Sequence, residues 1–174
     1  MISNKMVDAM NKQINAEMYS AYLYLSMVAY FDSINLPGFS KWMKAQAQEE
    51  VFHAMKFFNH LSERAVRAKL SAIEAPQTEW KSPLNVFEDA YKHEQKVTGM
   101  INDLVTLARS ENDHASDNFL QWYVKEQVEE EASADGVVQQ LKLVGDNKGG
   151  LFMLDKELST RVFNYAVATA PGGE

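Results

Sequence analysis

The chain has 174 residues, 46% of them hydrophobic and 24% charged, which is enough for one domain with a full apolar core. Its net charge is −7 and its 17 lysines and arginines are scattered, which argues against a nucleic-acid-binding surface. The absence of cysteine excludes disulfides, cysteine-ligated zinc and iron–sulfur clusters. No signal peptide is visible and the most apolar stretch, residues 18–31, is too short to span a bilayer, so we expect a cytoplasmic protein.

A first helix is predicted over residues 3–31, with Ser3 or Asn4 as its N-cap. Its apolar positions recur at steps of three and four, which is the period of a helix buried along one face. That face consists of Val7, Met10, Ile14, Glu17, Ala21, Tyr24, Val28 and Phe31. Glu17 is the one carboxylate in the row and lies near the middle of the helix.

A second helix, over residues 38–65, should return antiparallel after a short turn. Its buried face consists of Phe39, Met43, Gln46, Glu50, His53, Phe57 and Leu61. Glu50 and His53 are three residues apart and therefore neighbours on that face. Since an unpaired buried charge is costly, such groups normally have a partner or bind a metal.

Residues 66–82 are predicted to form a long crossover. Extended at about 3.3 Å per residue, this stretch can run the length of a helix of about 40 Å. The third helix, over residues 83–110, would then start at the opposite end of a bundle, with Ser82 as N-cap and Pro83 in its first turn. Its buried face consists of Leu84, Phe87, Tyr91, Glu94, Thr98, Ile101, Val105 and Ala108. Glu94 again lies near the middle.

The fourth helix is predicted over residues 115–144, after another short turn. Gln127 and Glu130 lie in the middle of its buried face, which consists of Leu120, Tyr123, Gln127, Glu130, Ala134, Val137 and Leu141. A glycine-rich break and a short fifth helix over residues 151–168 follow. The chain is therefore predicted to be one all-α domain, residues 1–174, built as a four-helix bundle with a long crossover between its second and third helices.

Four helices thus carry polar residues at the same level of one bundle interior. These residues are Glu17, Glu50, His53, Glu94, Gln127 and Glu130. Four ionised carboxylates buried together repel one another and lose hydration, and a pair of divalent or trivalent cations resolves this. Oxygen-rich ligation with one imidazole suits iron or manganese better than structural zinc. Glu50 lies between its neighbours on the buried face and is placed to bridge two metal ions.

Several stretches make the resemblance to a known family specific: QINAE at 13–17, YLYL at 22–25, QEEVFHA at 48–54 and FLQWYVKEQVEEE at 119–131. The chain resembles the non-haem ferritins of bacteria and archaea over nearly its whole length. The resemblance implies iron storage and detoxification, with oxidation of Fe²⁺ by O₂ at a dinuclear ferroxidase centre. It also implies a shell of twenty-four subunits in which the Fe(III) oxyhydroxide mineral is deposited.

The resemblance also assigns roles to residues. It implies that Glu17, Glu50 and His53 hold one iron and that Glu50, Glu94 and Glu130 hold the second, with Gln127 nearby. It implies a third, more exposed iron site made by Glu49, Glu126, Glu129 and Glu130. Tyr24 matches the family's redox-active tyrosine and is counted with Glu50 and Gln127 among the catalytic residues. Trp122 is either a further electron donor or a core residue.

One departure separates relatives within the superfamily. The second Glu-x-x-His of most di-iron bundles is replaced here by Gln127-x-x-Glu130, which disfavours bacterioferritins and oxygenases. Phe52 stands where bacterioferritin-like chains carry a haem-ligating Met, so no haem is expected. Two other classes stay open: a structural bundle with zinc or no metal, and a di-iron enzyme with an organic substrate.

The sequence also suggests where subunits contact one another and where iron enters. A second apolar stripe on the first helix suggests that subunits contact there, and it consists of Tyr19, Tyr22, Leu23, Met27 and Tyr30. By resemblance, the fifth helix would lie at a symmetry axis. Asp113 and Asp117 are candidates for an iron uptake path.

Overall fold

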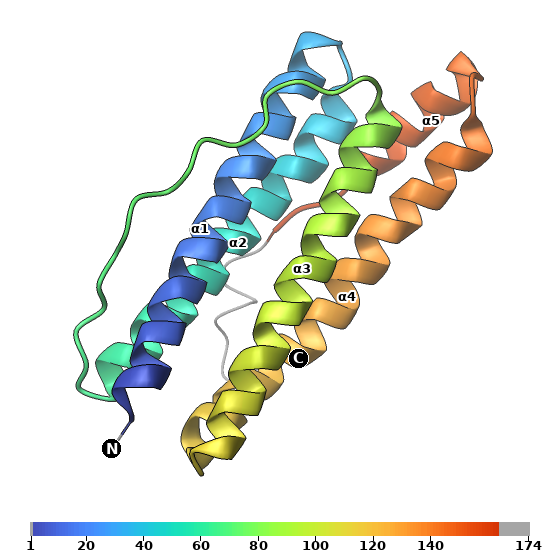
Figure 1. The fold of residues 1–174 in the computed structure, drawn as a ribbon. Coiled ribbons are helices and arrows are strands. Elements are labelled where there is room, and N and C mark those ends of the chain that lie inside the picture. The colour runs from blue at the N-terminus through green and yellow to red at the C-terminus, as the bar shows by residue number, and fades with distance from the viewer. Residues whose placement is uncertain (1, 164–174) are drawn as a thin grey trace.

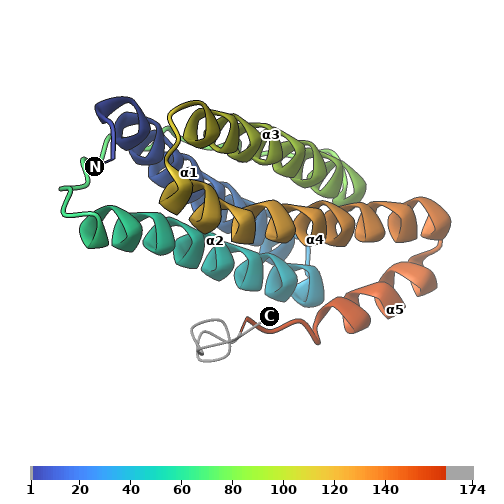
Figure 2. The ribbon, with the colours of Figure 1, turned by 90° about the horizontal axis from the view of Figure 1, so that it is seen from below.

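The computed structural model describes residues 2–163, and this part of the chain contains five α-helices and no strand. The helices are α1 (Asn4–Ser33), α2 (Pro37–Glu63), α3 (Pro83–Ser110), α4 (His114–Val144) and α5 (Lys148–Leu158). The four long helices form a bundle, and the short α5 packs near one end of it (Figures 1 and 2). This confirms the predicted four-helix bundle with a short fifth helix.

Local capping signals explain where the long helices begin. The Ser3 and Ser82 hydroxyls accept hydrogen bonds from backbone N–H groups in the first turns of α1 and α3, and the Asp113 carboxylate does the same for α4. In the short turns after α1 and α3, Asn35 and Asn112 have φ of 58° and 55°. Asparagine tolerates this left-handed conformation well, so both turns stay short and each helix pair is antiparallel.

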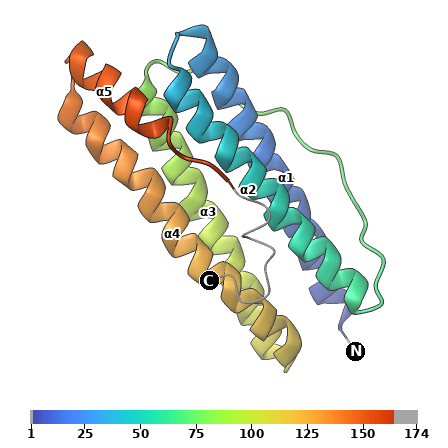
Figure 3. The same ribbon diagram turned by 180° about the vertical axis from the view of Figure 1, so that it is seen from behind.

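The crossover follows α1 along the length of the bundle (Figures 1 and 3). The Asn15 amide donates to the Ala72 carbonyl at 3.0 Å, and the Ser26 hydroxyl donates to the Gln77 carbonyl at 2.6 Å. Trp80 closes the segment, buried and with its indole N–H donating to Asp89 at 3.0 Å. The predicted crossover is confirmed, and it starts α3 at the end of the bundle where α1 ends.

The apolar core is divided into two clusters along the bundle axis. One is rich in aromatic rings, with Phe31 stacked on Phe39 at 5.1 Å between ring centroids. The other, towards the opposite end, contains Met10, Phe57 and Tyr123. Six buried polar residues of the four helices lie in sequence between the two clusters, so a polar layer is held between two apolar ones: Glu17, Glu50, His53, Glu94, Gln127 and Glu130.

The fifth helix differs from its prediction. It runs from Lys148 to Leu158 and not over residues 151–168, and the last five predicted residues lie outside the described part of the chain. It starts early because the Asn147 side chain accepts from the Gly150 N–H. At its end the Ser159 and Thr160 hydroxyls donate to nearby backbone carbonyls, a pattern that competes with helical pairing.

The second stripe on α1 also differs from its prediction. Leu23 and Met27 are buried in the chain's own core, and Tyr30 packs against Trp80 of the crossover at 5.6 Å. Tyr22 stays half exposed. The crossover therefore covers part of the surface that had been assigned to a neighbouring subunit. None of the helices within residues 2–163 has the length and apolarity needed to cross a membrane.

Candidate metal centre

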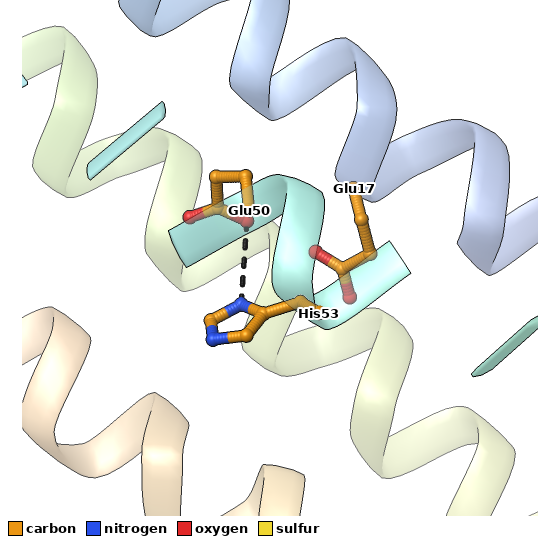
Figure 4. A group of neighbouring side chains, drawn as sticks. All are labelled: Glu17, Glu50 and His53. Carbon is orange, nitrogen blue, oxygen red and sulfur yellow. Dashed lines mark ion pairs between the residues drawn. The ribbon is translucent and has the colours of Figure 1, made fainter. Parts of the chain in front are cut away.

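Four helices bring their polar residues together in the middle of the bundle. Glu17 comes from α1, Glu50 and His53 from α2, Glu94 from α3, and Gln127 and Glu130 from α4, and none is more than 5% exposed. Glu17, Glu50 and His53 place one possible ligand atom each within 4.8 Å of one another. Figure 4 shows Glu17 reaching from α1 towards the other two on α2. His53, Glu126 and Glu130 form a second such group.

Glu50 and His53 are held side by side because they are one helical turn apart. The imidazole Nδ1 of His53 lies 3.5 Å from Oε2 of Glu50. On its other side the ring faces α4, where Nε2 lies 3.9 Å from Oε1 of Glu126. His53 is therefore the point shared by both groups of candidate ligands.

Glu94 is oriented by two donors. The Tyr24 hydroxyl donates to Oε1, and the Gln127 amide donates to Oε2 at 3.2 Å. The same amide lies 3.2 Å from the Glu94 carbonyl oxygen and 3.3 Å from the Thr98 hydroxyl. Gln127 therefore contacts the centre through Glu94, and the two groups of candidate ligand atoms found within residues 2–163 do not include Glu94.

Gln46 is a member of the centre to which the sequence assigned no role. Its amide donates to Oε1 of Glu50 at 3.1 Å and to Oε2 of Glu130 at 2.6 Å, so it links α2 to α4. Gln13 donates in the same way to Glu17 at 2.9 Å. Each glutamine stands four residues before a buried glutamate, and that spacing is the signal that could have revealed the pair.

The electrostatics of the centre favour a cation. Burial raises the pKa of Glu17, Glu50 and Glu130 well above the usual range, and the neighbouring carboxylates raise it further. Burial also raises the pKa of Glu94, against the effect of its donors Tyr24 and Gln127. Oε2 of Glu17 is buried without a hydrogen-bond partner. Such a set fits metal ions, which satisfy lone pairs and offset the negative charge together.

The residues expected at a third iron site are only partly assembled. Glu126 lies beside His53, while Glu129 is exposed on α4. Glu49 forms an ion pair with Arg161 of the segment that follows α5. Burial raises the pKa of both Glu49 and Glu126. Neither group of possible metal ligands found within residues 2–163 includes Glu49 or Glu129.

The other candidate residues have contacts within the chain. Trp122 packs edge-on against His53 at 5.4 Å between centroids, and the Lys56 ammonium lies 3.9 Å above its ring. The two aspartates proposed for iron uptake are both in ion pairs. Asp113 lies 3.1 Å from Arg64, and Asp117 lies 3.2 Å from Arg109.

Comparisons with known proteins point to one family. A family model described as a ferritin-like domain matches residues 7–144. A bacterial non-haem ferritin of Bacteroides fragilis is 44% identical, and the match covers 92% of this chain and all of the relative. One from Staphylococcus aureus is 37% identical, with 94% and 99% covered.

Solved structures extend the likeness to the backbone fold. An engineered closed form of the Archaeoglobus fulgidus ferritin is 60% identical with a TM-score of 0.93, and the match covers 94% of this chain and all of that one. The open-pore ferritin of the same organism is 61% identical with a TM-score of 0.91, with 92% and 98% covered. With this fold, this carboxylate layer and these relatives, the chain belongs to the ferritin family.

Proposed function

We propose that the protein stores iron by oxidising Fe²⁺ with dioxygen at the centre and depositing an Fe(III) oxyhydroxide mineral inside a shell of twenty-four subunits in the cytoplasm. The observation that carries this proposal is the layer of four buried carboxylates and one imidazole, contributed by four helices. The names of the ferritin relatives support iron as the metal. If the metal-free protein does not speed the oxidation of ferrous iron above its rate in buffer, the proposal fails.

Iron is the substrate, and the carboxylates bind it in pairs. We assign one Fe²⁺ to Glu17, Glu50 and His53 and the second to Glu50, Glu94 and Glu130, with Glu50 as the bridge. Two ions held about 4 Å apart can deliver two electrons together to dioxygen, so no superoxide need escape. The anionic ligand set favours the ferric product because oxidation adds positive charge to a negative cage.

Gln46 is expected to orient the bridging carboxylate. Replacing it in the variant Gln46→Met removes the hydrogen bonds to Glu50 and Glu130, and we expect the affinity of the centre for metal to fall about 10- to 100-fold. Anaerobic titration of Fe²⁺ measures this. Gln48→Met is the matched control, since Gln48 is exposed on the same helix and should bind iron like the wild type.

Tyr24 is placed to supply an electron to the centre. Its hydroxyl donates to Glu94, so an electron can leave the ring while the proton passes to that carboxylate. In Tyr24→Phe we expect a transient tyrosyl radical signal to be absent and the initial fast phase of iron oxidation to slow by about tenfold. Tyr123→Phe is the control, because the Tyr123 hydroxyl donates to a backbone carbonyl of His53 at 2.7 Å. A radical that persists without Tyr24 contradicts this role.

Four glutamates on the side of the centre nearer solvent would hold a third iron. We assign Glu49, Glu126, Glu129 and Glu130 to that ion, which would lie on the side of the centre nearer solvent. The raised pKa values of Glu49 and Glu126 show that burial disfavours their ionised forms, and a cation would offset this cost.

Exposed apolar side chains on α1 and α5 support the assembly of subunits into a shell. Tyr22 and Leu25 on α1 are each 50% exposed, and Phe152 and Met153 on α5 are still more so. Large apolar side chains in such positions are typical of surfaces that other subunits cover.

A further inference from the structure

Arg161, on the segment that follows α5, contacts a residue of the proposed third iron site. One nitrogen of its guanidinium forms an ion pair with Oε2 of Glu49, and the guanidinium carbon lies 4.0 Å from the centroid of the Trp42 ring. The two charged side chains are 21% and 18% exposed. The pair is therefore largely withdrawn from water, where an opposite charge attracts more strongly than at an open surface.

The position of Arg161 is set by how α5 is fixed to the bundle. The Asp155 carboxylate accepts hydrogen bonds from the Gly38 and Phe39 N–H groups at 2.8 and 3.1 Å, at the start of α2. A side chain at position 38 would place its Cβ 1.6 Å from the Asp155 carbonyl oxygen, so only glycine permits this approach. With α5 held there, the chain after it returns towards the middle of α2 (Figures 2 and 3).

The guanidinium holds one oxygen of a carboxylate that we assign to the third ion. Glu126 and Glu130 already lie with His53 in one group of possible ligands, whereas Glu49 stands apart from both groups found within residues 2–163. Nη1 of Arg161 is buried without a hydrogen-bond partner. A guanidinium with an unsatisfied buried donor is not fully stabilised where it lies, so its contact with Glu49 can be exchanged for another cation.

We propose that Arg161 acts as an internal substitute for the third metal ion. The proposal rests on the assignment of Glu49 to that site. One carboxylate cannot serve the guanidinium and the metal together at full strength, and the two positive charges repel each other. The third ion therefore binds after the two-iron centre is full, and its binding releases Arg161 and the segment of residues 159–163 from α2.

Equilibrium binding of Zn²⁺, a divalent probe without redox chemistry, tests this on the assembled metal-free protein. Calorimetric titration of the wild type should show two strong sites per chain and a weaker third. In Arg161→Gln the affinity of the third site should rise about tenfold while the first two stay unchanged. A third site that is unchanged or weaker in this variant would overturn the proposal.

Arg64→Gln is the matched control for the lost ion pair. Arg64 is also 21% exposed and lies 3.1 Å from a carboxylate, that of Asp113, which caps the start of α4 near one end of the bundle. This variant should bind Zn²⁺ like the wild type. If it also raised the affinity of the third site, the effect would belong to net charge and the proposal would fail.

Hydrogen exchange of the wild type gives a readout that needs no substitution. The Thr160 and Arg161 N–H groups donate to the Glu157 and Leu158 carbonyls at 3.1 and 3.2 Å, in a turn that Arg161 ties to α2 through Glu49. Loss of that tie should let the turn open more often, and hydrogen exchange measures this opening. Peptides spanning 159–163 should exchange faster on the third equivalent of Zn²⁺ and not on the first two. Unchanged or slower exchange would overturn the proposal. Because zinc is not oxidised, a failure of iron oxidation leaves this test intact.

Discussion

The variant Glu50→Ala is expected to lose rapid oxidation of ferrous iron and keep its fold. Glu50 lies beside His53, within reach of Glu17, and bonds to Gln46, so it is the carboxylate most central to the site. Without a bridging ligand the two ions are no longer held as a pair, and we expect the initial rate to fall at least about 100-fold. Stopped-flow absorbance measures the rate, and far-ultraviolet circular dichroism measures the helix content.

The control for this variant is Glu63→Ala on the same helix. Glu63 is exposed near the end of α2, outside the buried layer, so its removal should leave the rate within about twofold of wild type. A Glu50→Ala protein that oxidises iron at the rate of the control would remove Glu50 from the mechanism.

The metal-free protein is expected to become more stable as the pH falls from about 8 to about 6.5. Burial raises the pKa of Glu17, Glu50 and Glu130 in the folded state, while the unfolded chain keeps ordinary values of about 4.3. Above about pH 4.3 these three carboxyls therefore bind more protons in the folded state than in the unfolded chain, and they take them up as the pH falls through their raised pKa values. Each additional bound proton raises the free energy of unfolding by about 1.4 kcal/mol per pH unit of acidification.

Histidines limit this gain at lower pH. Burial lowers the pKa of His93 to about 4 and also lowers that of His60, so the unfolded chain takes up these protons first below about pH 6.5. Their effect opposes that of the carboxylates, and the increase in stability should level off there. Differential scanning calorimetry at fixed protein concentration measures the trend.

Saturating Zn²⁺ should reverse the dependence of folding stability on pH. Metal ions bind the ionised carboxylates, so acidification releases the metal and lowers the melting temperature. At about a thousand times its dissociation constant, a ligand of the folded state adds about 4 kcal/mol of stability per site. In the double variant Glu50→Gln and Glu130→Gln, stability should depend much less on pH, both without metal and with Zn²⁺. Metal-free wild type whose stability falls from pH 8 to 6.5 would contradict this account.

Much of the fold could be predicted because its signals are local. Apolar residues at steps of three and four marked the long helices, and Ser3 and Ser82 fixed two of the starts. The predicted end of α2 lies two residues too late, because Ala65 adopts a left-handed φ of 57°. Alanine rarely adopts this conformation, so the sequence gives no sign of it. The end of α5 was misplaced further, because it depends on hydroxyl contacts and on a segment held by a residue more than a hundred positions away.

The members of the centre could be predicted, and their contacts could not. Glu17, Glu50 and Glu94 each interrupted an apolar row near mid-helix, and the structure buries all three. Which donor meets which carboxylate depends on side chains from different helices, as in the bond from Gln46 of α2 to Glu130 of α4. Spacing along one helix carries no information about such pairs.

The most direct test of the central claim is the stoichiometry of ferrous oxidation by the metal-free protein. Stopped-flow absorbance is followed while Fe²⁺ is titrated per chain in air, with dioxygen uptake recorded in parallel. We predict a fast phase that saturates at two or three irons per chain, followed by slower growth of mineral. Oxidation no faster than in buffer, with no break in the titration, would contradict an oxidising di-iron centre and leave a helical bundle whose carboxylates bind zinc or another metal.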